Sequence, residues 1–176
     1  MDFKHRNYYN QYPTKGTGTT PEYQCSYNGI AYTIPANELG RTYDYSKMLF
    51  DYSNGYTEEQ ANAVSALMKD MGTAFMMGYS PVGSGAYDNN ALYGIINYFG
   101  YSKDARMEMA ESYSYDEWVD IIKKNLNEFG PTYYSGGSTS GGHAFVVDGY
   151  DNMDYFHFNF GWGGSSNGYY YLPENV

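Results

Sequence analysis

The sequence has little cysteine, no long apolar run and few charged residues, and these shortages exclude several classes of protein. Cys25 is the one cysteine among 176 residues, which excludes an internal disulfide and a zinc site built from several cysteines. No apolar run is long enough to cross a bilayer, so we expect no membrane insertion. Residues 1–6 are too polar for the core of a signal peptide, and we therefore expect no export signal in this chain.

Basic residues are scarce as well. Ten Lys and Arg stand against 20 Asp and Glu, which gives a net charge of −10 at pH 7. A field of that sign repels phosphate backbones and anionic lipid, so we expect no nucleic-acid partner. The chain is rich instead in tyrosine (24 residues) and glycine (21 residues), with a mean hydropathy of −0.64. Because tyrosine packs and hydrogen-bonds at once, such a chain can fold into a globular protein, and both an enzyme and a binding module remain open.

The first regular pattern in the chain indicates a hairpin. In residues 23–27 the larger side chains Tyr23, Cys25 and Tyr27 alternate with polar ones, and a second strand-like run follows at 30–34. Asn28-Gly29 stands between the two runs. Asn-Gly between two alternating runs is a strong signal for a two-residue hairpin turn. The sequence therefore places Cys25 on a hairpin strand.

Apolar residues then recur at helical spacing and predict three helices, over about 58–76, 89–99 and 115–129. Capping boxes beginning at Thr57 and Ser114 mark the starts of the first and third helices. Asp88 or Asn89 can cap the second helix, and Gly100 is expected to end it in a left-handed conformation.

The pattern changes to strands and glycines after Pro131, with strands expected near 133–134, 143–147, 155–160 and 168–172. Helices first and strands second predict an α+β fold with segregated layers. We expect a single domain over 1–176, with its helices mainly in 57–129. These helices should pack on or beside an antiparallel sheet built mainly from 131–172.

Three histidines are candidates for a catalytic base. His5 lies in a polar terminal segment and is expected to be solvated. His143 opens a strand directly after a run of small residues, where a peptide ligand could approach the backbone closely. His157 shares a strand face with Asn159, so it is either a packed sheet residue or a rival base.

The densest local signal is Asn159-Phe160-Gly161-Trp162-Gly163-Gly164, which strand propensity does not explain. In the functional interpretation Asn159 orients a histidine and Trp162 shields that hydrogen bond from water. We expect His143 and Asn159 to meet side chain to side chain at about 3 Å. The alternative interpretation is a glycine-rich bend with an aromatic plug.

These motifs resemble those of the streptopain family (peptidase family C10), a papain-like group of secreted bacterial cysteine proteases. The resemblance rests on two glycine-flanked segments, 142–149 and 156–164, with supporting matches at 12–18, 42–45, 78–86 and 97–100. It implies a papain-like fold and endopeptidase activity through a cysteine–histidine pair. The histidine matches His143, and its polar and aromatic support matches Asn159 and Trp162.

The resemblance further implies a peptide or protein substrate, an inhibitory propeptide, a secreted or cell-surface location and no metal or other cofactor. Glycine-rich stretches at 83–85 and 136–142 would form the walls of a cleft for an extended peptide. The substrate-binding residues expected from these stretches and from the aromatic motif are Ser84, Gly85, Gly141, Gly142 and Phe160.

Two features depart from the family pattern. The family commonly has Trp where this chain has Phe160. Its nucleophile opens a helix before the Tyr-Pro-x-Lys-Gly-Thr-Gly stretch, whereas residues 1–11 here include no cysteine. Cys25 is expected on a strand rather than at a helix start, where a thiolate is stabilised. We therefore expect this chain alone to lack peptidase activity, because the nucleophile is absent from it.

Two other functions are consistent with parts of the pattern. A non-catalytic pseudoprotease would bind peptides or a protein partner in the former cleft. A tyrosine-rich carbohydrate-binding or surface-binding module would account for the aromatics, but it leaves His143, Asn159 and Trp162 unexplained.

Overall fold

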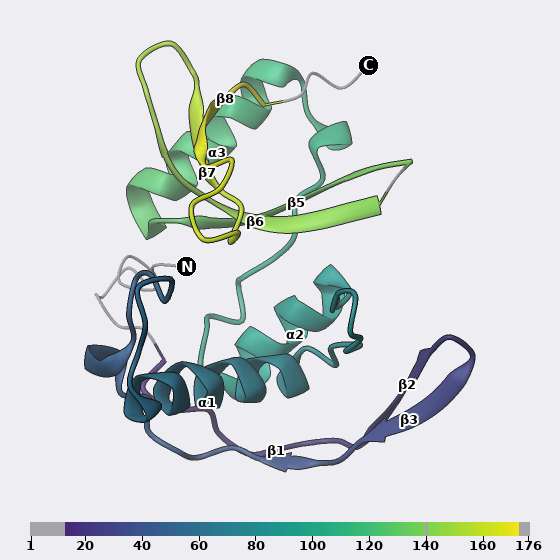
Figure 1. Ribbon diagram of the computed structural model, residues 1–176. Coiled ribbons are helices and arrows are strands. Elements are labelled where there is room, and N and C mark those ends of the chain that lie inside the picture. Colours follow the sequence, from purple (N-terminus) through teal and green to yellow (C-terminus); the bar gives the residue numbers. More distant parts are fainter. Residues whose placement is uncertain (1–12, 140, 173–176) are drawn as a thin grey trace. The chain divides into compact units, whose positions relative to one another are not determined.

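The computed structural model describes residues 13–139 and 141–172, which fall into two compact units (Figure 1). The first unit is Pro13–Met107, and the second is the described part of the chain from Glu108 onward. The single-domain organisation expected from the sequence stays a prediction.

The elements of the first unit are β1 (Thr19–Thr20), β2 (Tyr23–Tyr27), β3 (Ile30–Ile34), β4 (Asn37–Glu38), η2 (Tyr45–Lys47), α1 (Glu58–Ala74) and α2 (Asp88–Tyr98). Those of the second unit are η3 (Ala110–Ser112), α3 (Tyr115–Phe129), β5 (Thr132–Ser138), β6 (Gly141–Tyr150), β7 (Phe156–Asn159) and β8 (Gly168–Tyr170).

In the first unit α1 packs against α2, and a buried carboxylate ties the preceding loop to α1. Asp70 of α1 has no exposed surface, and it accepts hydrogen bonds from Asn37 Nδ2 and Tyr43 Oη, both at 2.9 Å. Arg41 Nε lies 3.2 Å from the same carboxylate. Burial, and then the bond to Asp70, raises the pKa of Tyr43, so this phenol remains a donor. A buried charge is tolerated because its lone pairs are satisfied in this way.

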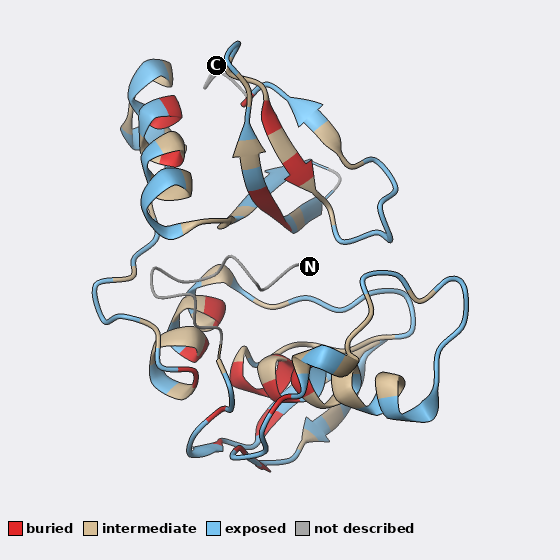
Figure 2. Ribbon diagram, turned by 90° about the vertical axis from the view of Figure 1, so that its left-hand side faces the viewer, coloured by how far each residue is buried: buried red, intermediate tan, exposed pale blue. Residues whose placement is uncertain are grey.

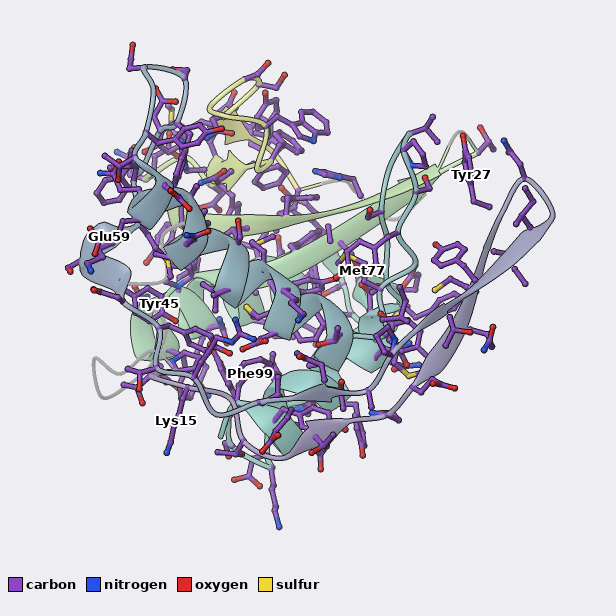
Figure 3. All side chains as sticks on the ribbon, turned by 60° about the horizontal axis from the view of Figure 1, so that its bottom comes forward. Lys15, Tyr27, Tyr45, Glu59, Met77 and Phe99 are labelled. Carbon is purple, nitrogen blue, oxygen red and sulfur yellow. The ribbon has the colours of Figure 1, made fainter. Side chains whose placement is uncertain are left out.

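The hairpin predicted around Asn28-Gly29 is confirmed. β2 and β3 pair antiparallel, and both turn residues have positive φ, at 52° and 76°. The hairpin is attached to the chain after α1, because Tyr23 Oη donates a hydrogen bond to the carbonyl of Met77 at 2.9 Å (Figure 3, where Met77 is labelled).

The second unit is a four-stranded antiparallel sheet in the order β5-β6-β7-β8, with α3 lying across one face (Figure 1). Figure 2 shows buried positions on both α3 and the sheet. The core of the unit consists of apolar residues from α3, β6, β7 and the chain just after β8: Trp118, Val119, Ile122, Phe145, Val147, Phe156, Phe158 and Leu172. A strand is confirmed within 155–160, and His157 and Asn159 share a face of it as expected, because both are half-buried while Phe156 and Phe158 are buried.

All three predicted helices form, and the capping boxes at Thr57 and Ser114 are both present. The predicted cap of α2 is wrong: its N-cap is Tyr87, which makes no side-chain cap hydrogen bond, and Asp88 lies in the first turn. There the carboxylate lies near the positive end of the helix dipole, where a negative charge is favourable. Gly100 has the expected left-handed conformation, with φ of 72°. Of the three helices, α3 shares a unit with the antiparallel sheet.

Candidate functional site

The second unit carries an open pocket of about 470 Å³ at the glycine-rich end of the β5–β6 pair. Its lining consists of Gly136, Gly137, Gly141, Gly142, His143, Phe145 and Phe160. The structure thus brings four sequence-predicted site residues together: Gly141, Gly142, His143 and Phe160.

Strand register explains why this end of the sheet is open. Gly136 lies directly opposite His143 in the β5–β6 ladder, and Gly137 lies opposite Gly142. A Cβ added at Gly136 would meet no heavy atom within 4 Å. The missing side chains therefore leave the imidazole of His143 uncovered on its β5 side.

Phe145 and Phe160 form the aromatic floor of the pocket, and Phe145 also belongs to the core of the unit. Tyr134 lies opposite Phe145, with ring centroids 5.4 Å apart, and accepts a hydrogen bond from Trp118 Nε1 at 3.0 Å. Burial raises the pKa of Tyr134, so the residue stays neutral under the site. The floor is therefore fixed by packing and by one buried hydrogen bond.

His143 is held by a backbone carbonyl and by aromatic rings. Its Nε2 lies 2.9 Å from the carbonyl oxygen of Phe160. The ring centroid lies 4.6 Å from that of Trp162 and 6.0 Å from that of Phe160. Because a carbonyl only accepts hydrogen bonds, this contact requires a proton on Nε2, which leaves Nδ1 to act on another group.

The predicted direct contact between His143 and Asn159 is wrong. Asn159 pairs with Val146, three residues from His143, so in a regular ladder the two side chains leave opposite faces of the sheet. The Oδ1 of Asn159 instead accepts the N–H of Gly161 at 3.0 Å.

One peptide group links the two residues nevertheless. The carbonyl that contacts His143 and the N–H that donates to Asn159 belong to the same peptide, between Phe160 and Gly161. Because the two groups of a trans peptide point in opposite directions, this unit is held from both sides. Asn159 is therefore linked to the imidazole through one backbone peptide rather than by direct contact.

Trp162 lies over His143 as expected, although it remains 54% exposed. Its ring also stacks on Phe160, with centroids 5.2 Å apart and planes 17° apart. Phe160 therefore supplies an aromatic wall where the family commonly has Trp. Gly161, Gly163 and Gly164 all have positive φ, which lets the chain turn tightly enough to place Trp162 there.

His157 is not a rival base in this pocket. Its Nδ1 contacts Asp148 Oδ1 at 2.5 Å, and its ring meets Tyr169 edge-on at 5.1 Å. It is absent from the lining of the pocket that contains His143. The interpretation of His157 as a sheet residue therefore fits the structure. His5 lies outside the described residues.

The remaining candidates belong to the first unit. Cys25 lies in the middle of β2, half-buried, and its Sγ is 3.8 Å from the carbonyl oxygen of Met77. Ser84 and Gly85 are exposed, in a turn closed by two backbone hydrogen bonds between Gly78 and Gly85. The pocket around His143 includes none of these residues.

Sequence reasoning missed the carbonyl of Phe160 and the side chain of Asn167, whose Oδ1 accepts the N–H of Phe160 at 3.1 Å. A backbone acceptor leaves no trace in residue identities. The one signal for Asn167 is its place at the end of a glycine-rich turn, directly before the last strand.

Within 13–139 and 141–172, no cluster of three or more His, Cys, Asp or Glu side chains could hold a metal ion. Across the same residues, every helix is too short or too polar to span a membrane.

Comparison with known proteins gives consistent matches. The sequence profile of the Peptidase C10 family matches residues 7–170. The chain is 37% identical over 162 residues to the thiol protease/hemagglutinin PrtT of Porphyromonas gingivalis, covering 92% of this chain and 18% of PrtT. It is 33% identical over 168 residues to streptopain of Streptococcus pyogenes, covering 93% of this chain and 42% of streptopain.

Two solved structures also match. Active wild-type interpain A, a cysteine protease of Prevotella intermedia, gives a TM-score of 0.78 at 35% identity, covering 92% of this chain and 68% of that one. A prointerpain A fragment with a cysteine-to-alanine substitution gives 0.76 at 36% identity, covering 92% of this chain and 51% of the fragment. The papain-like α+β fold expected from the sequence is thereby confirmed.

Proposed function

We propose that this chain, which belongs to the peptidase C10 family of cysteine peptidases, carries the acid–base half of a thiol endopeptidase site. The chain spans less than half the length of PrtT and of streptopain. The activity of the whole protein is therefore part of the proposal.

The observation that carries the proposal is the environment of His143. The imidazole lines an open pocket, its Nε2 is directed to the carbonyl of Phe160, and Trp162 covers one side. A peptidase of this class needs an imidazole with one nitrogen anchored and the other directed toward substrate. His143 has the first feature, and its Nδ1 is the nitrogen left for the second.

In the proposed reaction a thiolate attacks the carbonyl carbon of the scissile peptide bond. His143, protonated by the thiol, then gives its Nδ1 proton to the leaving amine as the carbon–nitrogen bond breaks. Water, deprotonated by His143, next hydrolyses the acyl-enzyme, and the proton returns to the thiol. The carbonyl of Phe160 accepts a hydrogen bond from Nε2–H throughout these steps.

Asn159 and Trp162 support the imidazole without taking part in bond changes. Asn159 holds the N–H of the peptide whose carbonyl orients His143. Trp162 limits the access of water to that carbonyl bond, and a hydrogen bond is stronger where water is excluded.

The nucleophile of the proposal is a cysteine other than Cys25. No helix begins at Cys25, and its sulfur contacts a carbonyl oxygen. A catalytic thiolate instead requires a helix N-terminus or an adjacent imidazolium. Since Cys25 is the single cysteine of the sequence, the nucleophile would come from polypeptide outside these 176 residues.

The proposed substrate is an extended peptide that passes the glycines of β5 and β6. Gly141, Gly142 and Phe160 line the pocket beside His143, which supports their assignment to substrate binding. Ser84 and Gly85 are also assigned to substrate binding, because they lie in an exposed turn with small side chains.

An inhibitory propeptide and action outside the cell complete the proposal. The first is supported by the structure of a pro form of interpain A, which this chain resembles at a TM-score of 0.76. The second rests on the family resemblance alone.

The test is an assay of protein hydrolysis, with reductant, on two proteins: this chain, and a version extended by the polypeptide encoded upstream of Met1. We expect activity in the extended version, its loss in His143→Ala, and its retention in the matched control His157→Ala. Casein cleavage by the short chain that disappears in Cys25→Ser would contradict the assignment of the nucleophile. A folded extended version that binds peptides without cleaving them would favour the pseudoprotease.

A further inference from the structure

The segment from Asn159 to Gly168 closes on itself beside His143. Two backbone hydrogen bonds form turns within it, from Ser165 N to the carbonyl of Trp162 and from Asn167 N to that of Gly164. Two side chains also hold it: Asn167 accepts the N–H of Phe160, and Tyr170 Oη donates to the carbonyl of Ser166 at 2.6 Å. We call residues 160–167 the aromatic loop, because it carries Phe160 and Trp162.

The hydrogen bond that the N–H of Phe160 donates to Asn167 Oδ1 restrains the backbone next to His143. The N–H of Phe160 lies in the peptide that precedes its Cα, and this N–H is fixed by Asn167. The carbonyl of Phe160 lies in the peptide that follows, which is fixed by Asn159 and His143. With both flanking peptides held by hydrogen bonds, the two backbone torsions of Phe160 are restrained, and so is the position of its carbonyl oxygen.

Loss of the Asn167 bond would release one of those two peptides. Phe160 would then rotate about its own Cα, and its carbonyl would leave the line of His143 Nε2. Register alone would not hold it, because β7 ends at Asn159 and the aromatic loop has no ladder partner of its own among the described strands.

We infer that Asn167 is a positioning residue for His143, acting through the N–H of Phe160, whose carbonyl receives the imidazole Nε2. This inference rests on the proposed function, in which His143 is the acid–base group. Asn167 does not touch the imidazole in this arrangement. Its role is to keep the imidazole in one tautomer, with the proton on Nε2 and Nδ1 directed to the reaction.

The first test does not depend on peptidase activity. Long-range proton–nitrogen NMR spectra of this chain report the tautomer of each histidine ring. The sequence has only His5, His143 and His157, so His143→Ala identifies the signals of His143. We expect a single Nε2–H tautomer in the parent, a mixture in Asn167→Leu, and a return to one tautomer in Asn167→Asp, which keeps an acceptor oxygen.

Asn127→Leu is the matched control. Asn127 lies on α3 of the same unit, and the substitution also removes side-chain hydrogen bonding, in this case with Tyr150 at the end of β6. It should leave the tautomer of His143 unchanged. An unchanged tautomer in Asn167→Leu would overturn the inference, and so would an equal change in Asn127→Leu. Unfolding of both Asn167→Leu and Asn167→Ala, with Asn127→Leu folded, would show that Asn167 holds the fold instead, which also overturns it.

The second test uses the version extended upstream of Met1. Misplacement of a catalytic group lowers the chemical step more than substrate binding. We expect Asn167→Leu to lower kcat by about tenfold or more with KM within about twofold, and Asn167→Asp to restore most of the loss. An inactive extended parent would refute the proposed function, whereas the tautomer spectra would still decide the role of Asn167. A rise in KM at unchanged kcat would contradict a positioning role.

Discussion

Gly136 lies opposite His143 in the β5–β6 ladder, and we predict that Gly136→Ala makes the protein more stable and its extended version less active. The position has no positive φ, and an added Cβ would meet nothing within 4 Å. Alanine can therefore adopt the strand conformation without strain. Its methyl group would enter the pocket that Gly136 and His143 both line.

The two effects have different sizes. Replacing a strand glycine by alanine reduces the entropy of the unfolded chain and stabilises by about 0.5–1 kcal/mol. Crowding a fitted space by one carbon costs about 1–3 kcal/mol, which corresponds to about a 5- to 150-fold loss in kcat/KM for a substrate in the pocket. The substitution should therefore separate stability from activity.

Denaturant unfolding and peptidase kinetics on the extended version measure the two quantities. Gly149→Ala is the matched control: Gly149 lies on β6, the strand paired with the one that carries Gly136, it has no positive φ, and a Cβ there would meet only His157 Cβ at 3.9 Å. We expect similar stabilisation with unchanged kcat/KM. Full activity in a stabilised Gly136→Ala variant would refute the claim that substrate occupies this pocket.

Three further predictions concern stability. Burial raises the pKa of Tyr23 from 10.0 to about 12, so the stabilising effect of its neutral phenol is complete below pH 10 and is lost as the pH rises towards 12. Tyr23→Phe should therefore remove that loss from unfolding curves measured at alkaline pH, and it should remove one late step from the titration of the tyrosine phenols. Hydrogen bonds from Ser114 lower the pKa of Glu117 below 4.5, so the contribution of its carboxylate to folding stability is present above pH 4.5 and is lost as the pH falls. In thermal unfolding, Glu117→Gln should therefore weaken the dependence of stability on pH in the acid range. Ser114→Ala should destabilise the protein by about 1 kcal/mol at neutral pH, because α3 loses its cap. A Cβ at Gly72 would lie 1.9 Å from Tyr79 Oη, so Gly72→Ala should lower the free energy of unfolding by about 1–3 kcal/mol, and Tyr79→Phe in the same protein should restore part of it. If denaturant unfolding shows that the effects of the two substitutions simply add, the predicted clash is contradicted.

Local signals in the sequence were sufficient for most of the secondary structure. The capping boxes at Thr57 and Ser114, and the hairpin at Asn28-Gly29, are patterns in which neighbouring residues satisfy each other, so no distant contact is needed to predict them. The predicted cap of α2 was wrong because Asp88 and Asn89 are equally plausible N-caps in sequence, whereas the N-cap is Tyr87, one residue earlier, and the helix begins at Asp88.

The candidate site was predictable in its side chains and not in its contacts. His143, Phe160 and Trp162 come together as the glycine-flanked motifs indicated. The partner of His143 was misassigned because the register of β6 and β7 decides which face Asn159 leaves, and register depends on pairing across the sheet. The true partner is a backbone carbonyl, which every residue possesses and no sequence pattern marks.

The central claim is that His143 activates a cysteine other than Cys25, and the rate of thiol alkylation tests it most directly. The version extended upstream of Met1 is treated with iodoacetamide between pH 5 and 8, and the alkylated cysteine is identified by peptide mass mapping. A thiolate paired with an imidazolium reacts at pH values where an ordinary thiol is inert.

We expect fast alkylation at acidic pH of one cysteine outside these 176 residues, slowed about tenfold or more by His143→Ala and unchanged by His157→Ala. Fast alkylation of Cys25 that depends on His143 would contradict the claim that His143 activates another cysteine. A reactive cysteine whose alkylation rate does not change in His143→Ala would contradict it as well.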